Sequence, residues 1–474
     1  NEKKLMTSSV TNSFNEVLLG LFKKDVDSAA VNYYVGLARS EVFSETEDYS
    51  SPYFQSQLRH SLQAVKTLAS SSFVVPYTEN IHQWNQNIIY DEYDNGVGTN
   101  YYVINSLNEV FICIETAKTI GFQTNDKRPS TVEPTSALAA AFGSNGTLAK
   151  TFRTTDQYKW RYLYKLSNLA IATFKSNAWL PVKKITDRAA QLPIPEEQIQ
   201  RNVQDSAVAG QILSIAIDSA GSGYSTLSPP TITITGNGDS ASFTCDIASN
   251  GQIARVRVDS NGNGVFAHGF GYDYATAVLS TGDGKLRPVI GPRAGVNADP
   301  VDTLKTRSLM LQVDFANDEF DTILAQNDFS QVCVMRNIKS YAGADFTGNT
   351  GLSVANLDVN NTGNQLTNDE VFKDGALTAV GKTMYHDTTT NKLYYYQDET
   401  TNFIPFTLAD PNLTSVDNDY NLTFTAVNNP DIDKYSGEIL YINNLGGEGL
   451  GTTTTNITRD PNQTEDIRIV IQLG

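Results

Sequence analysis

Short hydrophobic runs dominate the pattern of the chain. "NYYVGLARS", "TNYYVINS", "EVFICIET" and "KWRYLYKLS" are rich in aromatic and β-branched residues and are separated by Asn, Asp and Gly. Runs of this kind predict strands that are joined by turns. We therefore expect a mainly β protein with a few helices, of α+β type with a β-sandwich core. At 474 residues the chain is too long for one ordinary core, so we expect several domains.

Two segments near the start have helical spacing. "SFNEVLLGLFKK" places an apolar stripe at Phe14, Val17, Leu18, Leu21 and Phe22, with Asn12 or Ser13 in position to cap the first turn. A second helix is expected over 52–71, "PYFQSQLRHSLQAVKTLASS", where the apolar positions with a similar period are Phe54, Leu58, Leu62 and Val65.

An internal repeat marks residues 208–300. "GQILSIAIDSAGSG" at 210–223 recurs as "GQIARVRVDSNGNG" at 251–264, with Gly, Gln, Ile, Asp and Ser in register. The repeat predicts a duplicated β-unit, each copy a strand that runs into a Gly-rich turn. We interpret this stretch as an inserted β-sandwich module.

A second insertion is expected at 341–433, which is rich in Asn, Thr, Gly and Asp. Within it, "TMYH" and "KLYYYQ" predict a hairpin joined by "DTTTN". The low hydrophobicity of the first half indicates long loops, so the segment is predicted to be a polar hairpin and loop module.

The C-terminal stretch alternates apolar and polar residues. Ile467, Ile469, Ile471 and Leu473 predict a half-buried closing strand, with Tyr435 to Asn443 as its expected hairpin neighbour. The predicted domains are a core domain of residues 1–100 closed by 434–474, a second β-rich domain at 101–207, the insert at 208–300, a return to the core at 301–340, and the insert at 341–433.

Composition argues against several partners. Lys and Arg total 35 against 52 Asp and Glu, a formal charge of −17 without a basic cluster, so nucleic acid and anionic membrane are not expected as partners. Cys113, Cys245 and Cys333 each sit in an apolar run, which predicts buried thiols in a reducing compartment and no disulfide framework. No run approaches the roughly 18 apolar residues of a membrane span, and the start lacks a signal-peptide pattern.

Metal and phosphate motifs are incomplete. The histidines are His60, His82, His268 and His386, without metal-ligand spacing. "GALTAVGKT" at 375–383 has one residue too many for a phosphate loop and predicts a turn before the "TMYH" strand.

Two stretches partly match a calcium loop: 259–264, whose twelfth position falls on Phe270, and 358–369, which ends on Asp369 without flanking helices. Asx-type turns are the preferred interpretation of both, and calcium stays an alternative.

Catalytic sets are also missing from the pattern. There is no Gly-x-Ser-x-Gly elbow and no Ser, His and Asp set. Neighbouring carboxylates such as Glu45 and Glu47, or Asp318, Glu319 and Asp321, are common in an acidic chain, and a glycosidase pair stays open because its members can lie far apart in sequence. We expect a protein that is not an enzyme, with no catalytic, cofactor-binding or metal-binding residues and no cofactor.

The order of several landmarks resembles a known family. "TNSFNEVLLGLFKKD", "NYYVGLARSEVF", "AVKTLASSSFVVPYTENIHQW", "STVEPT" with "YKWRYLYKLS", "LAQNDFSQVCVMRNI", "YSGEILYINN" and "NQTEDIRIVIQL" follow one another. This order is similar to the baseplate wedge protein of T-even-like contractile-tailed phages, the product of gene eight. The resemblance covers about 250 to 280 residues and is carried by Gly36, Arg39, Ser40, Glu41, Val65, Lys66, Trp84, Glu133, Pro134, Trp160, Tyr162, Phe329, Gln331, Gly437, Glu438, Tyr441, Asn443, Gln463, Thr464, Glu465 and Ile467.

The chain also departs from that family. Val42 stands where the family has a Pro, Leu445 to Gly447 stand where it has an Arg-Pro run, and the two inserts have no counterpart in its smaller members. These departures indicate a larger relative and concern loop contacts rather than the framework.

The resemblance implies a structural subunit of a phage tail baseplate. Such a protein forms a homodimer within each wedge, contacts other wedge subunits, is assembled in the host cytoplasm into the virion, and takes part in baseplate rearrangement at infection. Two alternatives remain. One is a receptor-binding or adhesin module that recognises host glycans through the tyrosines of "KLYYYQ", although strand packing is the preferred interpretation of those rings. The other is a polysaccharide-cleaving enzyme.

Overall fold

The fold is a mainly β, multidomain one, as the sequence predicts. The computed structural model divides into two compact units, the first of Asn1–Leu19, Val75–Leu309 and Ile471–Gly474 and the second of Gly20–Val74 and Met310–Val470. The domain boundaries drawn from the sequence stay predictions. The structure describes residues 12–26, 32–38, 51–68, 74–79, 82–94, 100–118, 127–141, 151–185, 195–259, 267–316, 328–360, 363–398, 400–401, 403–418, 420–444, 457–458, 462 and 464–472.

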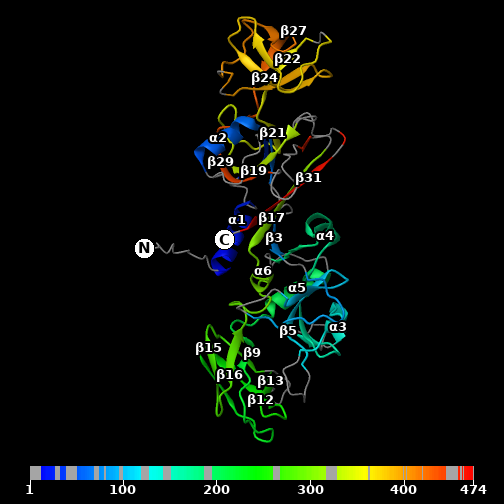
Figure 1. The fold of residues 1–474 in the computed structure, drawn as a ribbon, viewed down its shortest axis with the longest axis vertical. Coiled ribbons are helices and arrows are strands. Elements are labelled where there is room, and N and C mark those ends of the chain that lie inside the picture. The colour runs from blue at the N-terminus through cyan, green and yellow to red at the C-terminus, as the bar shows by residue number, and fades with distance from the viewer. Residues whose placement is uncertain are drawn as a thin grey trace, which may run out of the picture. The chain divides into compact units, whose positions relative to one another are not determined.

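The first unit is built around an antiparallel sheet (Figure 1). Its strands, in the order β4-β5-β7-β6, are β4 (Tyr102–Ile104), β5 (Glu109–Glu115), β7 (Lys159–Lys165) and β6 (Phe152–Arg153). On β5, Val110, Ile112 and Ile114 belong to one core, whereas Phe111 and Cys113 belong to another. Both faces of this sheet are therefore buried, which explains why "EVFICIE" reads as an unbroken apolar run.

Helices and a second strand pair complete this part of the unit. The core with Trp160 is packed by α3 (Ser136–Ala141) and α5 (Pro195–Asp205) through Leu138 and Ile199, and the opposite core by α4 (Asn168–Phe174) through Ile171. The remaining elements are α6 (Pro300–Thr303) and β8 (Trp179–Pro181), which pairs with β3 (Val74–Glu79). Among the described residues, no helix is long and apolar enough to cross a membrane.

The 208–300 stretch folds around its own core. A sheet of β10 (Ile232–Gly236), β15 (Ala275–Leu279), β16 (Lys285–Ile290) and β9 (Ile212–Ser219) and the pair of β12 (Phe243–Ile247) and β13 (Ile253–Val258) share one hydrophobic cluster. A further pair joins β11 (Asp239–Ala241) and β14 (His268–Phe270). The insert is thus a two-layer β module.

The repeat forms its predicted strands. The two copies become β9 and β13, and the residue that opens each copy, Gly210 or Gly251, has a left-handed φ of 63° or 78°. A Cβ at Gly210 would lie 2.3 Å from the backbone N of Tyr272, so glycine is required there. The Gly-rich turn of the second copy, at 260–266, lies outside the described residues.

The second unit contains a sheet assembled from distant segments. Its order is β21-β2-β1-β19-β29, formed by β21 (Thr350–Leu352), β2 (Leu62–Thr67), β1 (Tyr33–Ala38), β19 (Gln331–Arg336) and β29 (Glu438–Asn444). Helix α2 (Pro52–Ser61) precedes β2, and its Leu58 packs in the core of this sheet with Tyr34 and Cys333. Two short strand pairs are formed by segments that come before or after β19 and β29 in the chain. They are β18 (Asp328–Phe329) with β30 (Ile457–Thr458) and β20 (Lys339–Ser340) with β28 (Ile432–Asp433).

The predicted helices are only partly correct. Helix α2 ends at Ser61 because Leu62 turns to an extended conformation (φ −61°, ψ 128°) and continues as β2. The expectation of helix through residue 71 is therefore wrong, although its buried positions Phe54 and Leu58 are right. Strand pairing with β1 outweighs the helical spacing, and Leu62 is fully buried in the strand.

The N-terminal helix, α1, spans Asn12–Val26, so Ser13 lies inside the helix rather than at its cap. Its predicted apolar stripe is also only partly right. Leu19 and Val26 are buried, whereas the side chains of Val17 and Leu21 are each 57% exposed. Leu18 and Phe22 of the predicted stripe are half-buried, and the Phe22 ring packs on Tyr33. The buried face is therefore rotated toward Leu19 and Val26.

Residues 355–428 form a closed six-stranded barrel, labelled by β22, β24 and β27 in Figure 1. Its strands, in the order β22-β25-β24-β23-β26-β27, are β22 (Ala355–Val359), β25 (Lys392–Tyr396), β24 (Val380–Asp387), β23 (Val371–Asp374), β26 (Asn412–Ser415) and β27 (Asn421–Asn428). The predicted hairpin is confirmed as β24 and β25. The long loops predicted for the first half are wrong. That half contributes β21 to the five-stranded sheet and β22 and β23 to the barrel, where apolar side chains on one face of each strand are enough to line the interior.

The terminal hairpin is not formed. The last strand, β31 (Glu465–Gln472), lies beside β17 (Ser308–Phe315), whereas β29 pairs with β19. Gln312 Nε2 donates to Asp466 Oδ1 at 3.1 Å across the β17 and β31 neighbours. The prediction of a half-buried strand is right, since Ile469 is buried while Asp466 and Arg468 are more exposed. Most of the expected hairpin tip, at 445–456, lies outside the described residues.

Candidate functional site

The predicted chemistry-bearing residues do not gather. His60 lies by the rings of Phe403 and Tyr435, His82 by Tyr102, and His386 Nδ1 accepts from the backbone N of Leu366 at 3.0 Å. Within the described ranges no group of three or more His, Cys, Asp or Glu side chains suits a metal ion. The three cysteines are confirmed as buried free thiols, and burial raises the pKa of Cys333 to about 12.

The phosphate-loop look-alike is a turn, as predicted. Residues 375–379 connect β23 to β24, and Asp374 holds the turn by accepting from Thr378 N at 2.6 Å and Thr378 Oγ1 at 2.9 Å. The lysine of the motif, Lys382, lies within β24 and donates to Asp398 at 2.6 Å.

The acidic residues at the two ends of the second calcium-loop candidate, 358–369, make other contacts. Asp358 lies in β22 and accepts from Asn428 Nδ2 at 2.8 Å, whereas Asp369 accepts from the hydroxyl of Tyr396 at 2.7 Å. The first candidate, at 259–264, falls mostly outside the described residues, as do Glu45, Glu47, Asp318, Glu319 and Asp321.

The tyrosine hairpin is part of the barrel core. Tyr394 and Tyr395 are buried, and the Tyr395 ring packs edge to face on Phe372 and Phe406 at 6.0 and 5.1 Å between centroids. The interpretation of these two rings as strand packing is confirmed, so they do not form an exposed platform for sugar rings.

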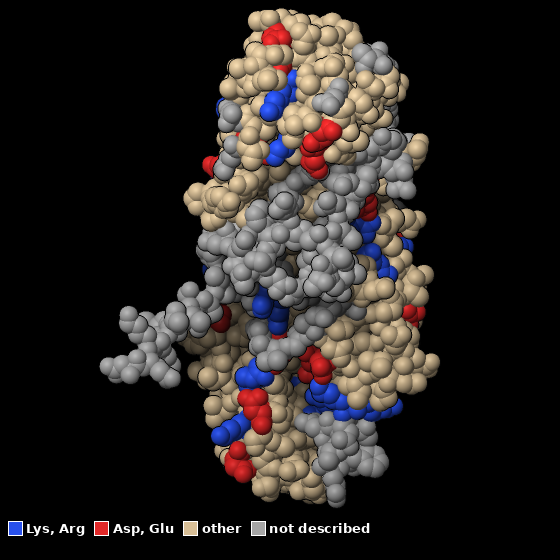
Figure 2. Space-filling view, turned by 45° about the horizontal axis from the view of Figure 1, so that its top comes forward, with Lys and Arg blue, Asp and Glu red and all other residues tan. Residues whose placement is uncertain are grey.

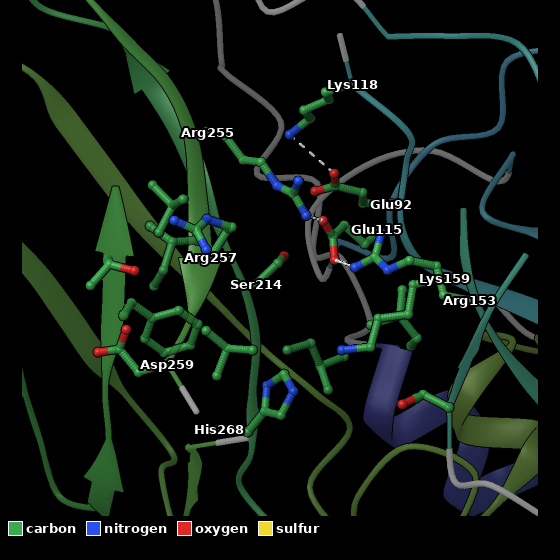
Figure 3. A pocket seen from close by; sticks show the side chains of 18 of the residues that line it. Glu92, Glu115, Lys118, Arg153, Lys159, Ser214, Arg255, Arg257, Asp259 and His268 are labelled. Atoms are coloured by element: carbon green, nitrogen blue, oxygen red, sulfur yellow. Dashed lines mark hydrogen bonds and ion pairs between the residues drawn. The ribbon is translucent and has the colours of Figure 1, made fainter. Parts of the chain in front are cut away.

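A cavity within the first unit brings together charged side chains that the sequence did not single out. It has a volume of about 480 Å³, in the range of roughly 300–1,000 Å³ that small-molecule sites occupy. One side comes from the β5, β6 and β7 edge and the other from the 208–300 module. Figure 3 shows its labelled side chains: Glu92, Glu115, Lys118, Arg153, Lys159, Ser214, Arg255, Arg257, Asp259 and His268.

The cavity carries an excess of positive charge in an acidic protein. Five cations and three carboxylates line it, although the whole chain has a formal charge of −17. Two cations are individually matched. Lys118 pairs with Glu92 at 3.1 Å, and Arg257 makes two hydrogen bonds of 2.7 and 2.6 Å to Asp246, which does not line the cavity. The other cations that line the cavity are Arg153, Lys159 and Arg255.

Glu115, at the end of β5, is shared by two arginines. Arg153 Nη2 donates to its Oε2 at 2.6 Å, and Arg255 Nη2 donates to its Oε1. Burial alone would raise the pKa of this carboxyl, but the charges of Arg153 and Arg255 outweigh burial and lower it. Glu115 is thus ionised, and one carboxylate faces two guanidinium groups.

Lys159 adds a third cation to the same corner. It opens β7, and its side chain is buried, with 8% of the residue exposed. Burial lowers the pKa of Lys159; Glu115 opposes that change, and Arg153 and Arg255 reinforce it. Arg153, Arg255 and Lys159 therefore all lie close enough to Glu115 to act on its charge.

His268 and Asp259 form the opposite, hydrogen-bond-accepting side. His268 Nδ1 lies 2.8 Å from Ile212 O, and burial together with Lys159 lowers the pKa of His268 to about 4. The imidazole is then neutral near pH 7, donates from Nδ1 to the carbonyl and keeps Nε2 as an acceptor. Because a carbonyl rather than a carboxylate holds Nδ1, Ser214 and His268 do not make a hydrolase triad.

Figure 2 shows how charge is distributed over one face of the molecule. On the face shown in Figure 2, acidic and basic side chains stand in small groups among other residues over the described surface.

No model of a known protein family matches the chain, and no curated protein matches it significantly in sequence.

Proposed function

We propose that the chain is a structural subunit of a contractile-tail baseplate wedge, which assembles as a homodimer with other wedge subunits in the virion. The main support for this proposal is that residues which carry the family resemblance, although distant in sequence, lie together in one sheet. Gly36, Val65 and Tyr441 come from segments up to about 400 positions apart in sequence, yet they lie on β1, β2 and β29 of one sheet.

These residues make packing contacts and lie next to hydrogen bonds that hold the sheet together. Gly36 stands opposite both Val65 and Cys333, and a Cβ there would lie 2.7 Å from Cys333 Sγ. Next to the same sheet, Arg59 of α2 donates to the carbonyls of Lys434, Ser436 and Gly437 at 3.0, 2.6 and 2.8 Å. Gly437 is itself one of the resembling residues, so this arginine ties the resembling C-terminal segment to an N-terminal helix.

A second set of resembling residues supports the core of the first unit. Trp84 packs on the cluster that contains Trp160 and Tyr162. Glu133 accepts from Ser106 N and Oγ at 2.7 and 3.0 Å, and Pro134 O accepts from Asn105 Nδ2 at 2.9 Å. The resemblance therefore rests on residues that hold strands and turns, which favours a structural role over catalysis.

Arg39, Ser40, Glu41 and Gln463, which also carry the resemblance, lie outside the described residues. Glycan recognition through "KLYYYQ" is the less favoured alternative, because the rings of Tyr394 and Tyr395 are buried.

The homodimer is tested by multi-angle light scattering of the purified chain. We expect a mass of twice 51.9 kDa over a tenfold range of concentration near the micromolar. A monomer throughout that range would contradict the dimer.

A further inference from the structure

The cavity of the first unit has the polarity of a ligand site. Its positive corner holds Arg153, Arg255 and Lys159 around the carboxylate of Glu115. Lys159 is buried, whereas the side chains of Arg255 and Arg153 are 18% and 35% exposed. Cations that outnumber the carboxylates lining a cavity favour an anionic ligand. Figure 3 shows the arginine ends meeting at Glu115 and the Lys159 amine extending into the cavity beside them.

The other side of the cavity is suited to hydroxyl groups. Asp259 accepts from Ser242 Oγ at 2.6 Å through one oxygen, and a carboxylate has further lone pairs to accept a ligand hydroxyl. The Nε2 of neutral His268 is an acceptor too, and Ser214 and Thr244 line the same space. Phe152 and Phe243 add apolar walls.

We propose that this cavity binds a small hydroxylated organic anion, a sugar acid or a sugar phosphate. The carboxylate or phosphate sits against Arg255, Arg153 and Lys159, and hydroxyl groups of the sugar donate to Asp259 and His268. Arginine favours such oxyanions because its fork of donors matches their geometry. Ligand binding is separate from the assembly role, and either can fail without the other.

The test is isothermal titration calorimetry of the full chain at low and high salt. The probes are glucuronate for the carboxylate, glucose 6-phosphate for the phosphate, glucose as the neutral match, and inorganic phosphate as the bare ion. We expect one of the two sugar anions to bind at least about tenfold more tightly than glucose and inorganic phosphate, and to weaken as salt rises.

Matched variants locate the site. Arg255→Gln is expected to weaken the bound probe by about tenfold or more, because a charge-assisted hydrogen bond is lost. Arg287→Gln is the control: Arg287 also belongs to the 208–300 module and pairs with a carboxylate, Asp94, at 2.8 Å, but it does not line the cavity. It should leave binding unchanged. Lys159→Met repeats the test at a residue of β7 instead of β13 if Arg255→Gln lowers folding yield.

Several results would overturn the proposal. One is no binding of either sugar anion tighter than about 10 mM. Another is equal affinity for glucose, which would remove the role of charge, or equal affinity for inorganic phosphate, which would leave an adventitious ion only. Unchanged affinity in both Arg255→Gln and Lys159→Met would place any bound probe elsewhere on the chain.

Discussion

Substitution of Gly36 by Ala tests the packing of the five-stranded sheet most sharply. The new Cβ would lie 2.7 Å from Cys333 Sγ and 2.9 Å from Leu62 Cδ1. Both approaches are closer than carbon and sulfur atoms allow, so the neighbouring side chains must move. Overpacking of this kind lowers the free energy of unfolding by about 1–3 kcal/mol. Alanine also has less backbone entropy than glycine in the unfolded chain, which offsets about 0.4–1 kcal/mol of that loss. We expect Gly36→Ala to destabilise the sheet by about 1–2 kcal/mol.

Hydrogen exchange followed by mass spectrometry measures this locally. Peptides that cover β1 should exchange about 5–30-fold faster in Gly36→Ala than in the wild type. Gly20→Ala is the matched control of opposite sign. Gly20 lies in α1, and apart from its chain neighbours and the backbone of the helix itself no atom lies within 4 Å of the position that a Cβ would take there. Alanine should therefore favour the helix by about 0.5–1 kcal/mol.

A double-mutant cycle identifies the clash. Cys333→Ala removes the sulfur, so Gly36→Ala should cost less in that background than in the wild type. Exchange of β1 at the wild-type rate in Gly36→Ala, or an equal cost in both backgrounds, would refute the packing of Gly36 against Cys333.

Three further predictions concern other parts of the fold. The pKa of His268 is about 4 in the folded chain and 6.5 ordinarily, so between these pH values the unfolded chain binds a proton that the folded chain does not. The stability of the first unit should therefore fall as pH drops from about 6.5 to 4. Thermal scans should show a shallower fall of melting temperature with pH in His268→Asn, and an equal fall in both proteins would contradict this. Asp156→Ala should destabilise the first unit by about 1–3 kcal/mol in urea unfolding, since Asp156 Oδ2 accepts from Thr131 N and Val132 N at 2.7 and 2.9 Å; no change in midpoint would refute it. Tyr395→Ala should cost the barrel about 3–5 kcal/mol, seen as faster hydrogen exchange in β22 to β27, whereas unchanged exchange would contradict burial of that ring.

Local pattern predicted individual strands well and their partners poorly. "EVFICIE" and "KWRYLYK" became β5 and β7 because aromatic and β-branched side chains suit a strand whose two faces are both covered. Nothing in residues 465–472 says that their neighbour is β17 rather than β29, since pairing depends on contacts between distant segments. The end of α2 at Ser61 likewise follows from the pairing of β2 with β1 and not from helix propensity.

The cavity left only a weak trace in the sequence. Arg255 and Arg257 alternate in "IARVRV", which places two cations on one face of β13. Lys159 begins a strand more than 90 residues earlier, and no spacing rule connects it with them. Such a site arises from the packing of one module on another, which a search for motifs within single segments does not detect.

The place of this protein in an assembled particle is the most direct measurement of its role. Cryo-electron microscopy of contractile tails purified from a phage that encodes this chain should show it in the baseplate, as two copies in each wedge. Tails that contain no copy of the chain, or copies confined to fibres that contact the host, would contradict the account.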